Sequence, residues 1–237
     1  MIKAIVTGHS RGLGAAVAAE LLARAIPVLG LARHRVGVEG MEEVEIDLSD
    51  AGALAHWLSG HALASFLAGC DTALLVNNAG VVSPVGPLAE QEPAAALRAA
   101  VLNVGAPLAL SAAFVRAAPQ AERRILHISS GAGRSAYPGW SVYCATKAAL
   151  DQHARAIALD GDPRVRACSL APGVIDTDMQ AEIRATPDAR FPLRQRFVDL
   201  KEGGVLVAPE DCARTLVDYL TGARFGSEAV DDLRELR

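Results

Sequence analysis

Residues 2–14 read Ile-Lys-Ala-Ile-Val-Thr-Gly-His-Ser-Arg-Gly-Leu-Gly, and their pattern is the strongest indication of the fold. The β-type run 2–6 leads into a glycine turn of the form Gly-x-x-x-Gly-x-Gly, and the alanine-rich stretch 15–25 is typical of a helix. A strand, a glycine turn and a helix in this order point backbone N–H groups and a helix N-terminus at a phosphate. Glycines permit a tight turn and the close approach of a pyrophosphate, although they also make ordinary turns. Directly after a first strand, the stretch predicts a nucleotide-binding loop.

Two further apolar runs end in polar side chains. The run 72–76 is followed by Asn77 and Asn78, whose amides can pin neighbouring strands and a cofactor ribose, or can belong to a simple turn. The run 125–128 is followed by two serines, of which Ser130 is the second. Open α/β sheets place ligand contacts at the carboxyl ends of their strands. Ser130 is therefore a candidate ligand contact, with a plain loop residue as the alternative.

Tyr143 and Lys147 stand four residues apart in an alanine-rich segment. On a helix this spacing puts both side chains on one face, one turn apart. A fixed ammonium a few Å away favours the phenolate and lowers the pKa of a tyrosine from its usual value of about 10. Such a pair can exchange a proton with a carbonyl or alcohol oxygen. Taken alone, the pair also fits an ordinary exposed helix face.

Strand and helix patterns alternate along the chain without a linker or repeat. We expect strands near 2–6, 27–32, 43–47, 72–76, 123–129 and 164–170, with a weak last strand near 226–230. We expect helices at 12–25, 50–68, 90–117, 141–160 and 209–221. This alternation predicts one α/β domain over residues 1–237, a Rossmann-type, doubly wound parallel sheet with helices on both faces. The segment 177–207 fits neither pattern, because it carries two prolines and many charges.

Composition narrows the class of protein. The 237 residues are 51% hydrophobic, which is ample for a core, and the net charge of −4 without a basic tail argues against nucleic acid as a partner. The four cysteines show neither metal spacing nor a disulfide framework, so we expect no metal site and reduced thiols in a cytoplasmic protein. The first strand begins at Ile2 and leaves no room for a signal peptide. Charged residues interrupt the apolar stretches, so we expect no membrane span.

Together these motifs resemble the short-chain dehydrogenase/reductase family over nearly the whole chain. Seven features occur in the family's order and approximate spacing: the glycine loop, Asn-Asn-Ala-Gly at 77–80, Asn103, Ser130, Tyr143, Lys147, and Pro172-Gly173 through Thr177. The local sequences 129–131, 139–145 and 172–180 are similar to the branch that contains sepiapterin reductases and bacterial benzil reductases.

The resemblance implies hydride transfer between a nicotinamide and a substrate carbonyl. It implies that Tyr143 is the general acid, that Lys147 lowers its pKa and binds the nicotinamide ribose, and that Ser130 donates to the carbonyl oxygen. Asn103 holds a relay water in this scheme, although a purely structural partner for its amide remains possible. Thr177 binds the carboxamide or, alternatively, caps a helix.

Cofactor choice follows from charge. Sites that prefer NAD place an acid near the end of the second strand, where it binds the ribose 2′-OH. Here that acid is absent, Arg33 follows the strand, and Arg11 lies in the glycine loop. Guanidinium groups suit a 2′-phosphate, so we expect NADP(H), with two solvated surface charges as the alternative. Asp47 resembles the residue that contacts adenine, or caps the next helix. The expected cofactor contacts are Gly8, Ser10, Arg11, Gly12, Leu13, Gly14, Arg33, Asp47, Leu48, Asn78, Ala79, Gly80, Tyr143, Lys147, Pro172, Gly173, Val174 and Thr177.

The substrate is less constrained. By resemblance, the segment 177–207 is a flap that covers the substrate; otherwise it is a surface excursion. Trp140 and Tyr137 suit an aromatic or planar diketone, with ordinary packing as the alternative. Asp231 falls where an acid anchors the pterin in sepiapterin reductases, or is a solvated residue near the chain end. The candidate substrate contacts are Ser130, Tyr137, Trp140, Met179, Gln180 and Asp231.

We therefore expect an NADPH-dependent carbonyl reductase. The resemblance also implies a homodimer or homotetramer that pairs the helices at 90–117 and 141–160. The alternatives are a 3-oxoacyl thioester reductase and a non-catalytic NADP-sensing protein. The sequences 139–140 and 179–180 argue against the first. The presence of Ser130, Tyr143, Lys147 and Asn103 argues against the second.

Overall fold

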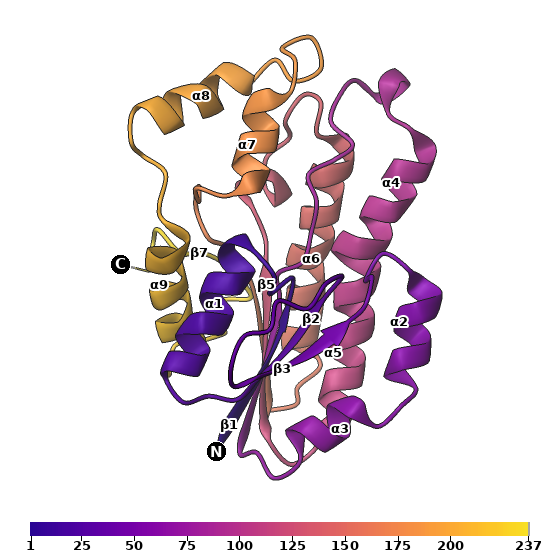
Figure 1. Ribbon diagram of the computed structural model, residues 1–237, viewed down its shortest axis with the longest axis vertical. Helices are drawn as coiled ribbons and strands as arrows, with labels where there is room; N and C mark the ends of the chain where they lie inside the picture. The colour runs from indigo at the N-terminus through magenta and orange to yellow at the C-terminus, as the bar shows by residue number, and fades with distance from the viewer. Residues whose placement is uncertain (237) are drawn as a thin grey trace.

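One sheet of seven parallel strands forms the centre of the molecule, which a computed structural model describes over residues 1–236 (Figure 1). The last residue of the predicted domain, Arg237, lies outside the described residues. The strand order is β3-β2-β1-β4-β5-β6-β7. The strands are β1 (Ile2–Thr7), β2 (Val28–Ala32), β3 (Met41–Glu45), β4 (Thr72–Asn77), β5 (Glu122–Ile128), β6 (Val165–Ala171) and β7 (Val230–Asp232). The predicted doubly wound α/β fold is confirmed, and the order reverses at β1 and β4, where such sheets open a crevice at the carboxyl ends of the strands.

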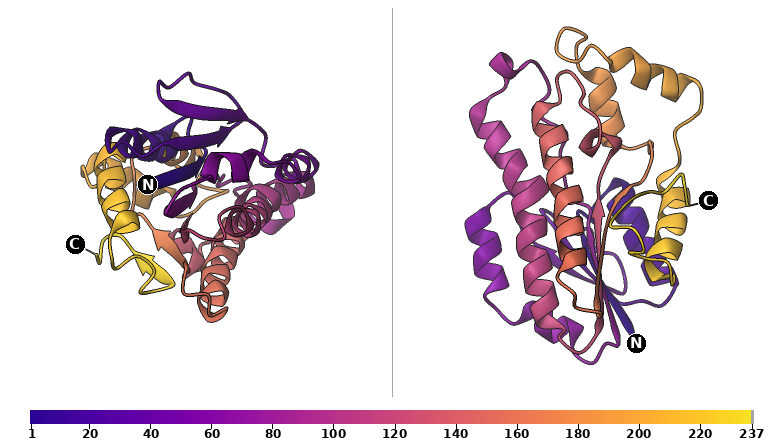
Figure 2. Two further views of the ribbon diagram at one scale, coloured as in Figure 1. Left: turned by 90° about the horizontal axis from the view of Figure 1, so that it is seen from below. Right: turned by 180° about the vertical axis from the view of Figure 1, so that it is seen from behind.

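Helices cover both faces of the sheet, and for that reason its central strands are apolar on both sides (Figure 2). Successive residues of β1 point to opposite faces. Ala4 and Val6 join a core under α1 (Gly12–Ala23) and α9 (Pro209–Thr221), whereas Ile5 joins the core on the other face. That second core is closed by α2 (Ala51–Leu58), α3 (Ala62–Leu67), α5 (Ala106–Ala117) and α6 (Ser141–Leu159).

Two strands lie away from their expected positions. Strand β3 covers 41–45 rather than 43–47, because its register places Val44 beside Leu31 of β2. Strand β7 covers 230–232 rather than 226–230, because Gly226 turns the chain with a φ of 72°. Pairing with β6 begins only afterwards, where Val230 lies beside Ser169.

Two expected helices are interrupted. The run 50–68 divides into α2 and α3, with the poor helix formers Ser59 and Gly60 between them. The run 90–117 divides into α4 (Pro93–Ala100) and α5, separated by a wide π-helical turn at Val101–Gly105. Pro107 lies at the start of α5, where its missing N–H is tolerated. The wide turn brings Asn103 into the interior.

The continuous helical run 93–117 is long and apolar enough to cross a membrane by length and composition. The sequence analysis expected no membrane span, and this helical run corrects that expectation by its length and composition. Within its most apolar window 44% of the residues are buried inside the molecule, and Leu110 and Phe114 belong to the core beside the sheet. A core helix meets the same criterion, so the observation carries little weight.

The segment 177–207 contains two helices that the sequence patterns did not predict, α7 (Asp178–Ala185) and α8 (Arg194–Glu202). Both stand beyond the carboxyl ends of the strands, at the top of Figure 1. They are held there by a third apolar cluster, in which Ile183 and Phe197 pack with Trp140. The helices are short and strongly charged, and for that reason their periodicity is weak in the sequence.

Candidate active site

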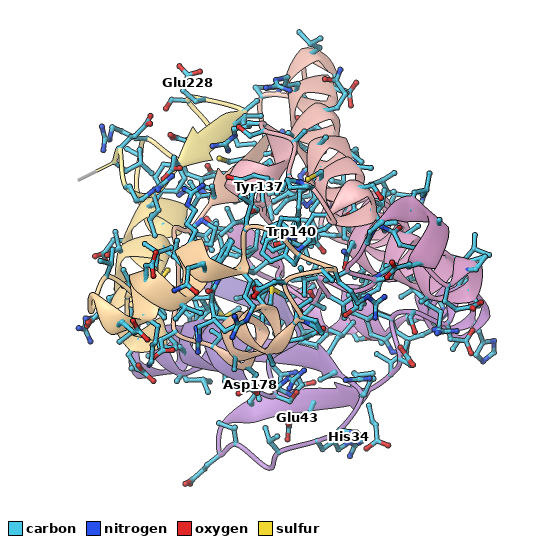
Figure 3. All side chains as sticks on the ribbon, turned by 90° about the horizontal axis from the view of Figure 1, so that it is seen from above. His34, Glu43, Tyr137, Trp140, Asp178 and Glu228 are labelled. Carbon is cyan, nitrogen blue, oxygen red and sulfur yellow. The ribbon has the colours of Figure 1, made fainter. Side chains whose placement is uncertain are left out.

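A cavity of about 910 Å³ opens at the carboxyl edge of the sheet. Figure 3 looks down on this edge and places His34, Glu43 and Asp178 toward one side, and Tyr137 and Trp140 toward the other. Most of the predicted site residues line the cavity, although they come from segments far apart in sequence. Those that line it are Gly8, Ser10, Arg11, Gly12, Leu13, Arg33, Asp47, Leu48, Asn78, Ala79, Gly80, Ser130, Tyr137, Trp140, Tyr143, Lys147, Pro172, Gly173, Val174, Thr177, Met179 and Gln180. Gly14, Asn103 and Asp231 do not line it.

The glycine loop forms a phosphate-sized cradle between β1 and α1. Gly8 and Gly12 adopt positive φ angles of 70° and 56°, which favour glycine. Gly14 lies behind the loop, where an added Cβ would stand 2.2 Å from the Gly8 carbonyl oxygen. The first two glycines therefore shape the loop, and the third lets α1 pack against it. The loop and the N-terminus of α1 fit the pyrophosphate of a dinucleotide.

The two asparagines at the end of β4 have different partners. The Asn78 amide donates to the Thr7 carbonyl at 2.9 Å, and the Thr7 hydroxyl accepts the Asn78 N–H at 3.0 Å. Asn77 reaches the other way, to the ring of His127 on β5 at 3.1 Å and to Ser111 on α5 at 3.4 Å. Asn78 thus fixes the cavity wall beside the glycine loop, whereas Asn77 is buried beneath it.

Ser130, Tyr143 and Lys147 meet at the middle of the cavity. Ser130 follows β5, and the other two lie on successive turns of α6 with exposed fractions of 8% and 5%. Burial raises the pKa of Tyr143 to about 12, an effect that a hydrogen bond with the Ser130 hydroxyl opposes. The Lys147 ammonium donates to the Ile128 carbonyl at 2.7 Å and lies 5.6 Å from the centre of the Tyr143 ring. Burial lowers its own pKa to about 8, against the charge of Asp151.

This electrostatic arrangement differs from the expected one. The group that opposes the raised pKa of Tyr143 is the Ser130 hydroxyl rather than the Lys147 ammonium. The pKa is raised instead of lowered because the Tyr143 phenol is desolvated, and desolvation disfavours its charged form.

Asn103 has the hydrogen-bond partners that its burial requires. Its Oδ1 accepts the Val81 N–H at 2.9 Å, and its Nδ2 donates to the Val81 carbonyl at 2.8 Å and to the Thr146 hydroxyl at 3.2 Å. Asn103 therefore ties the wide helical turn to the segment after β4 and to α6, behind the cavity wall.

Arg33 and Asp47 stand at the far end of the cavity, after β2 and β3. The Asp47 carboxylate accepts the N–H and hydroxyl of Ser49 at 2.9 and 2.7 Å. These bonds, opposed by desolvation, hold the pKa of Asp47 below its usual value, and the Arg33 guanidinium adds to the effect. Asp47 does not cap α2; Asp50 does, by accepting the Ala53 N–H at 2.9 Å.

A buried histidine and a glutamate, neither of them anticipated, position the chain after β2. His9 of the glycine loop contacts Glu43 of β3 at 2.8 Å, and its ring occupies the space that Gly30 of β2 leaves open. Glu43 also accepts the N–H groups of Val36 and Gly37, each at 2.8 Å. The loop that carries Arg33 is therefore anchored to the glycine loop.

The segment 177–207 is joined to the glycine loop by an ion pair between Arg11 and Asp178, at 3.1 Å. Both side chains are largely exposed, at 69% and 75%, so the pair is only weakly stabilising. Thr177 begins α7 but makes no side-chain capping bond. Thr177 therefore occupies the N-cap position of α7, as the alternative expected, but its side chain lies against Gly12 instead of capping the helix.

Aromatic residues close the opposite end of the cavity. Trp140 stacks on Phe191, with ring centres 4.6 Å apart and planes 10° apart, and meets the edge of Tyr143 at 5.3 Å. Tyr137 lies 5.4 Å from Trp140 and is less buried. Phe191 thus covers one face of the Trp140 ring, and Tyr137 is the more accessible of the two rings.

The placement of Asp231 corrects its candidacy as a substrate contact. Its carboxylate accepts the Tyr219 hydroxyl at 3.3 Å, away from the cavity. The side chain of the next residue, Asp232, points to the opposite face of the sheet, because successive side chains of a strand alternate. There Asp232 holds Arg234 at 2.6 Å and lies 3.9 Å from Arg134.

Sequence reasoning missed several charged residues that line the cavity. They are Arg98 on α4, Glu182 on α7, Arg196 on α8 and Arg234 after β7. No local motif marks them, because they lie on elements far apart in the sequence and meet only in the folded molecule. Among residues 1–236, no cluster of three or more His, Cys, Asp or Glu side chains is placed to hold a metal ion.

Comparisons with known proteins agree with this geometry. The profile of the short chain dehydrogenase family matches residues 3–188. A benzil reductase ((S)-benzoin forming) of Bacillus cereus is 32% identical over 93% of this chain and 94% of its own, and a sepiapterin reductase of Xenopus laevis is 30% identical over 94% and 92%. The crystal structure of a short-chain dehydrogenase/reductase from Burkholderia vietnamiensis is 48% identical, with a TM-score of 0.70 over 98% of both chains. That of the KRED1-Pglu enzyme is 29% identical, with a TM-score of 0.83 over 98% of this chain and 100% of its own. This chain therefore belongs to the short-chain dehydrogenase/reductase family of oxidoreductases, which use nicotinamide nucleotides and act on CH–OH and C=O groups, and within it to the branch of the benzil and sepiapterin reductases.

Proposed function

We propose that this protein is an NADPH-dependent carbonyl reductase that acts on a small ketone or diketone with an aromatic or planar group. The observation that carries the proposal is the convergence of Ser130, Tyr143 and Lys147 in the middle of one cavity, between arginines at one end and aromatic rings at the other. The similarity to benzil reductases supports the same class of substrate.

Each residue of the centre has a role that its position permits. The Tyr143 hydroxyl donates the proton to the carbonyl oxygen, and the Ser130 hydroxyl donates a hydrogen bond that strengthens as negative charge develops there. Lys147 remains an ammonium near neutrality, because its pKa is about 8, and binds the nicotinamide ribose. Asn103 holds the wall beside Lys147 and orders the water through which the proton is replaced. The bound nicotinamide supplies the hydride.

The cavity fits a dinucleotide along its length. The cradle at Gly8 and Gly12 would hold the pyrophosphate, and Asn78 to Gly80 would border the ribose. Arg33 and Arg11 would bind a 2′-phosphate. Arg11 would then give up its ion pair with Asp178 and pair with the phosphate instead. The remaining cofactor contacts are those expected from the sequence. In the same proposal, the segment 177–207 covers the substrate, and the protein acts in the cytoplasm.

The decisive experiment is oxidation of NADPH and of NADH by the purified protein, with benzil, sepiapterin and an acetoacetyl thioester as substrates. NADPH-dependent reduction of benzil or sepiapterin supports the proposal. Turnover of the thioester alone would replace it with a 3-oxoacyl thioester reductase. Tight NADPH binding without turnover would indicate a sensing protein.

A further inference from the structure

The substrate end of the cavity carries two arginines that come from different elements. Arg196 extends from α8 of the flap, and Arg234 follows β7 near the end of the chain. Most of the wall between them is apolar, formed by residues such as Ile183, Phe197 and Leu200. Within residues 1–236, the Arg196 guanidinium makes no hydrogen bond or ion pair. Two cations thus face a largely apolar space.

Arg234 is held in place by Asp232. Its Nε and Nη2 donate to the two carboxylate oxygens at 2.8 and 2.6 Å, and its backbone N–H donates to the same carboxylate at 3.0 Å. A guanidinium carries five N–H donors, so this pairing leaves three of them available. The side-chain stem lies over Gly173, where an added Cβ would stand 3.6 Å from its Cγ and Cδ. The donor group is therefore pre-oriented at the cavity rim.

Three of the nearby acids already have partners, whereas Glu235, the residue after Arg234, acts on its guanidinium only electrostatically. Asp178 pairs with Arg11, and Glu182 accepts a hydrogen bond from the Ser83 hydroxyl. Asp232 is shared between Arg234 and the more distant Arg134. Tyr137 stands close enough to Arg234 to interact with it electrostatically. The Tyr137 hydroxyl also lies near Gly131, the residue after Ser130, because a Cβ added at Gly131 would stand 3.9 Å from it. Arg234 and the Tyr137 hydroxyl thus form a patch beside Ser130. Asp231, the acid expected at this place, does not line the cavity.

We propose that the preferred substrate is an oxo acid, a carbonyl compound with an apolar or aromatic group and a carboxylate, and that Arg234 binds the carboxylate. Planar guanidinium groups bind carboxylates through paired charge-assisted hydrogen bonds. Arg196 approaches the same end of the substrate from the flap. The inference rests on the proposed carbonyl reduction. In that reaction a hydride adds to the carbonyl carbon, the carbonyl oxygen takes the Tyr143 proton, and the carboxylate keeps its charge.

The test compares benzoylformate with its methyl ester, which has the same ring and the same ketone but no charge. For the native protein we expect a higher kcat/KM with the acid. Arg234→Gln should lower the ratio of kcat/KM for acid over ester roughly 10- to 100-fold, the effect of losing hydrogen bonds to a charged group. Arg196→Gln should lower it by a smaller factor. Arg214→Gln, which removes a surface arginine of α9 outside the cavity, is the matched control.

A binding measurement separates recognition from turnover. Titration calorimetry of mandelate, the acid that this reduction would form, should show binding in the presence of NADP⁺ that Arg234→Gln weakens and Arg214→Gln leaves unchanged. If benzil and the ester are reduced, but the acid is no better and Arg234→Gln leaves the ratio intact, the oxo-acid proposal is overturned while carbonyl reduction stands. If none of the carbonyl compounds is reduced, the proposed function fails and the oxo acid falls with it.

Discussion

At the scale of single residues, burial determines the ionisation of Tyr143 and Lys147, the pair at the middle of the cavity. It raises the pKa of Tyr143 to about 12 and lowers that of Lys147 to about 8. Near neutrality both side chains are therefore protonated, as the proposed proton donor and its neighbouring cation must be. Neither value follows from the spacing Tyr-x-x-x-Lys, which is the same for exposed and buried pairs.

Replacement of Tyr143 by Phe removes only the proposed proton donor. We expect kcat to fall about 100- to 10,000-fold, the usual contribution of a general acid. The dissociation constant for NADPH, measured by fluorescence titration, should change little, because the ring still packs against Trp140. Turnover within a factor of a few of the native rate would remove Tyr143 from the mechanism.

Arg33→Ala tests which cofactor the cavity prefers. Loss of the guanidinium should raise the dissociation constant of NADPH roughly tenfold or more, the effect of a hydrogen bond to a charged group. It should leave that of NADH within about twofold. Isothermal titration with both nucleotides measures the difference. Equal losses for NADPH and NADH would show that Arg33 does not bind the 2′-phosphate.

Asp151→Asn tests how the ammonium of Lys147 is maintained. Asp151 is buried one turn beyond Lys147 on α6, accepts the hydroxyls of Ser129 and Ser169 at 2.7 Å each, and raises the pKa of Lys147 against the effect of burial. Without that charge, Lys147 loses its proton at a lower pH. The alkaline limb of the pH profile of kcat/KM, expected near pH 8, should therefore move to lower pH.

The matched control for this shift is Asp160→Asn, at the exposed C-terminal end of the same helix. It should leave the limb in place. A similar displacement in both variants, or none in Asp151→Asn, would contradict the assigned role.

At the scale of elements, short breaks in regular structure create the site. The glycine loop joins β1 to α1 so closely that Gly14 has no space for a side chain. The wide turn between α4 and α5 brings Asn103 against the segment after β4. The helices α7 and α8 stand beyond the sheet and supply cavity walls that no strand provides.

Gly14→Ala should destabilise the protein and abolish nucleotide binding, because its Cβ would overlap the Gly8 carbonyl. We expect the free energy of unfolding to fall by about 1–3 kcal/mol, as for other overpacked sites. Gly105→Ala is the control, since Gly105 is helical and has open space around its Cβ position. It should be neutral or stabilise by up to about 1 kcal/mol. Urea unfolding of both variants measures the difference, and equal stabilities would refute the steric account.

At the scale of the whole molecule, the fold gathers distant segments at one edge of the sheet. The outer faces of α4, α5 and α6 carry the exposed apolar residues Leu97, Leu108 and Leu159. These are the helices that we expect to pair between subunits, and we propose that the protein is a homodimer or homotetramer.

Light scattering after size exclusion should therefore give a mass of two or four chains at micromolar concentration. Leu97→Glu, together with Leu108→Glu, should shift this mass toward one chain, because it places charges in the paired helices. Val205→Glu, at an exposed apolar position after α8, should not. A mass of one chain for the native protein would refute the proposal.

Local patterns determined much of this protein. The glycine loop, the alternation of apolar runs and the spacing of Tyr143 and Lys147 predicted the fold and most residues of the cavity, because each depends on neighbours within one or two elements. Local patterns did not reveal where the flap helices begin, that Asp231 faces Tyr219, or that Arg196 and Arg234 reach the cavity. These features depend on strand register and on packing between residues far apart in the chain. The charges that line the cavity were therefore decided only when the sheet, the segment 177–207 and the C-terminal segment came together.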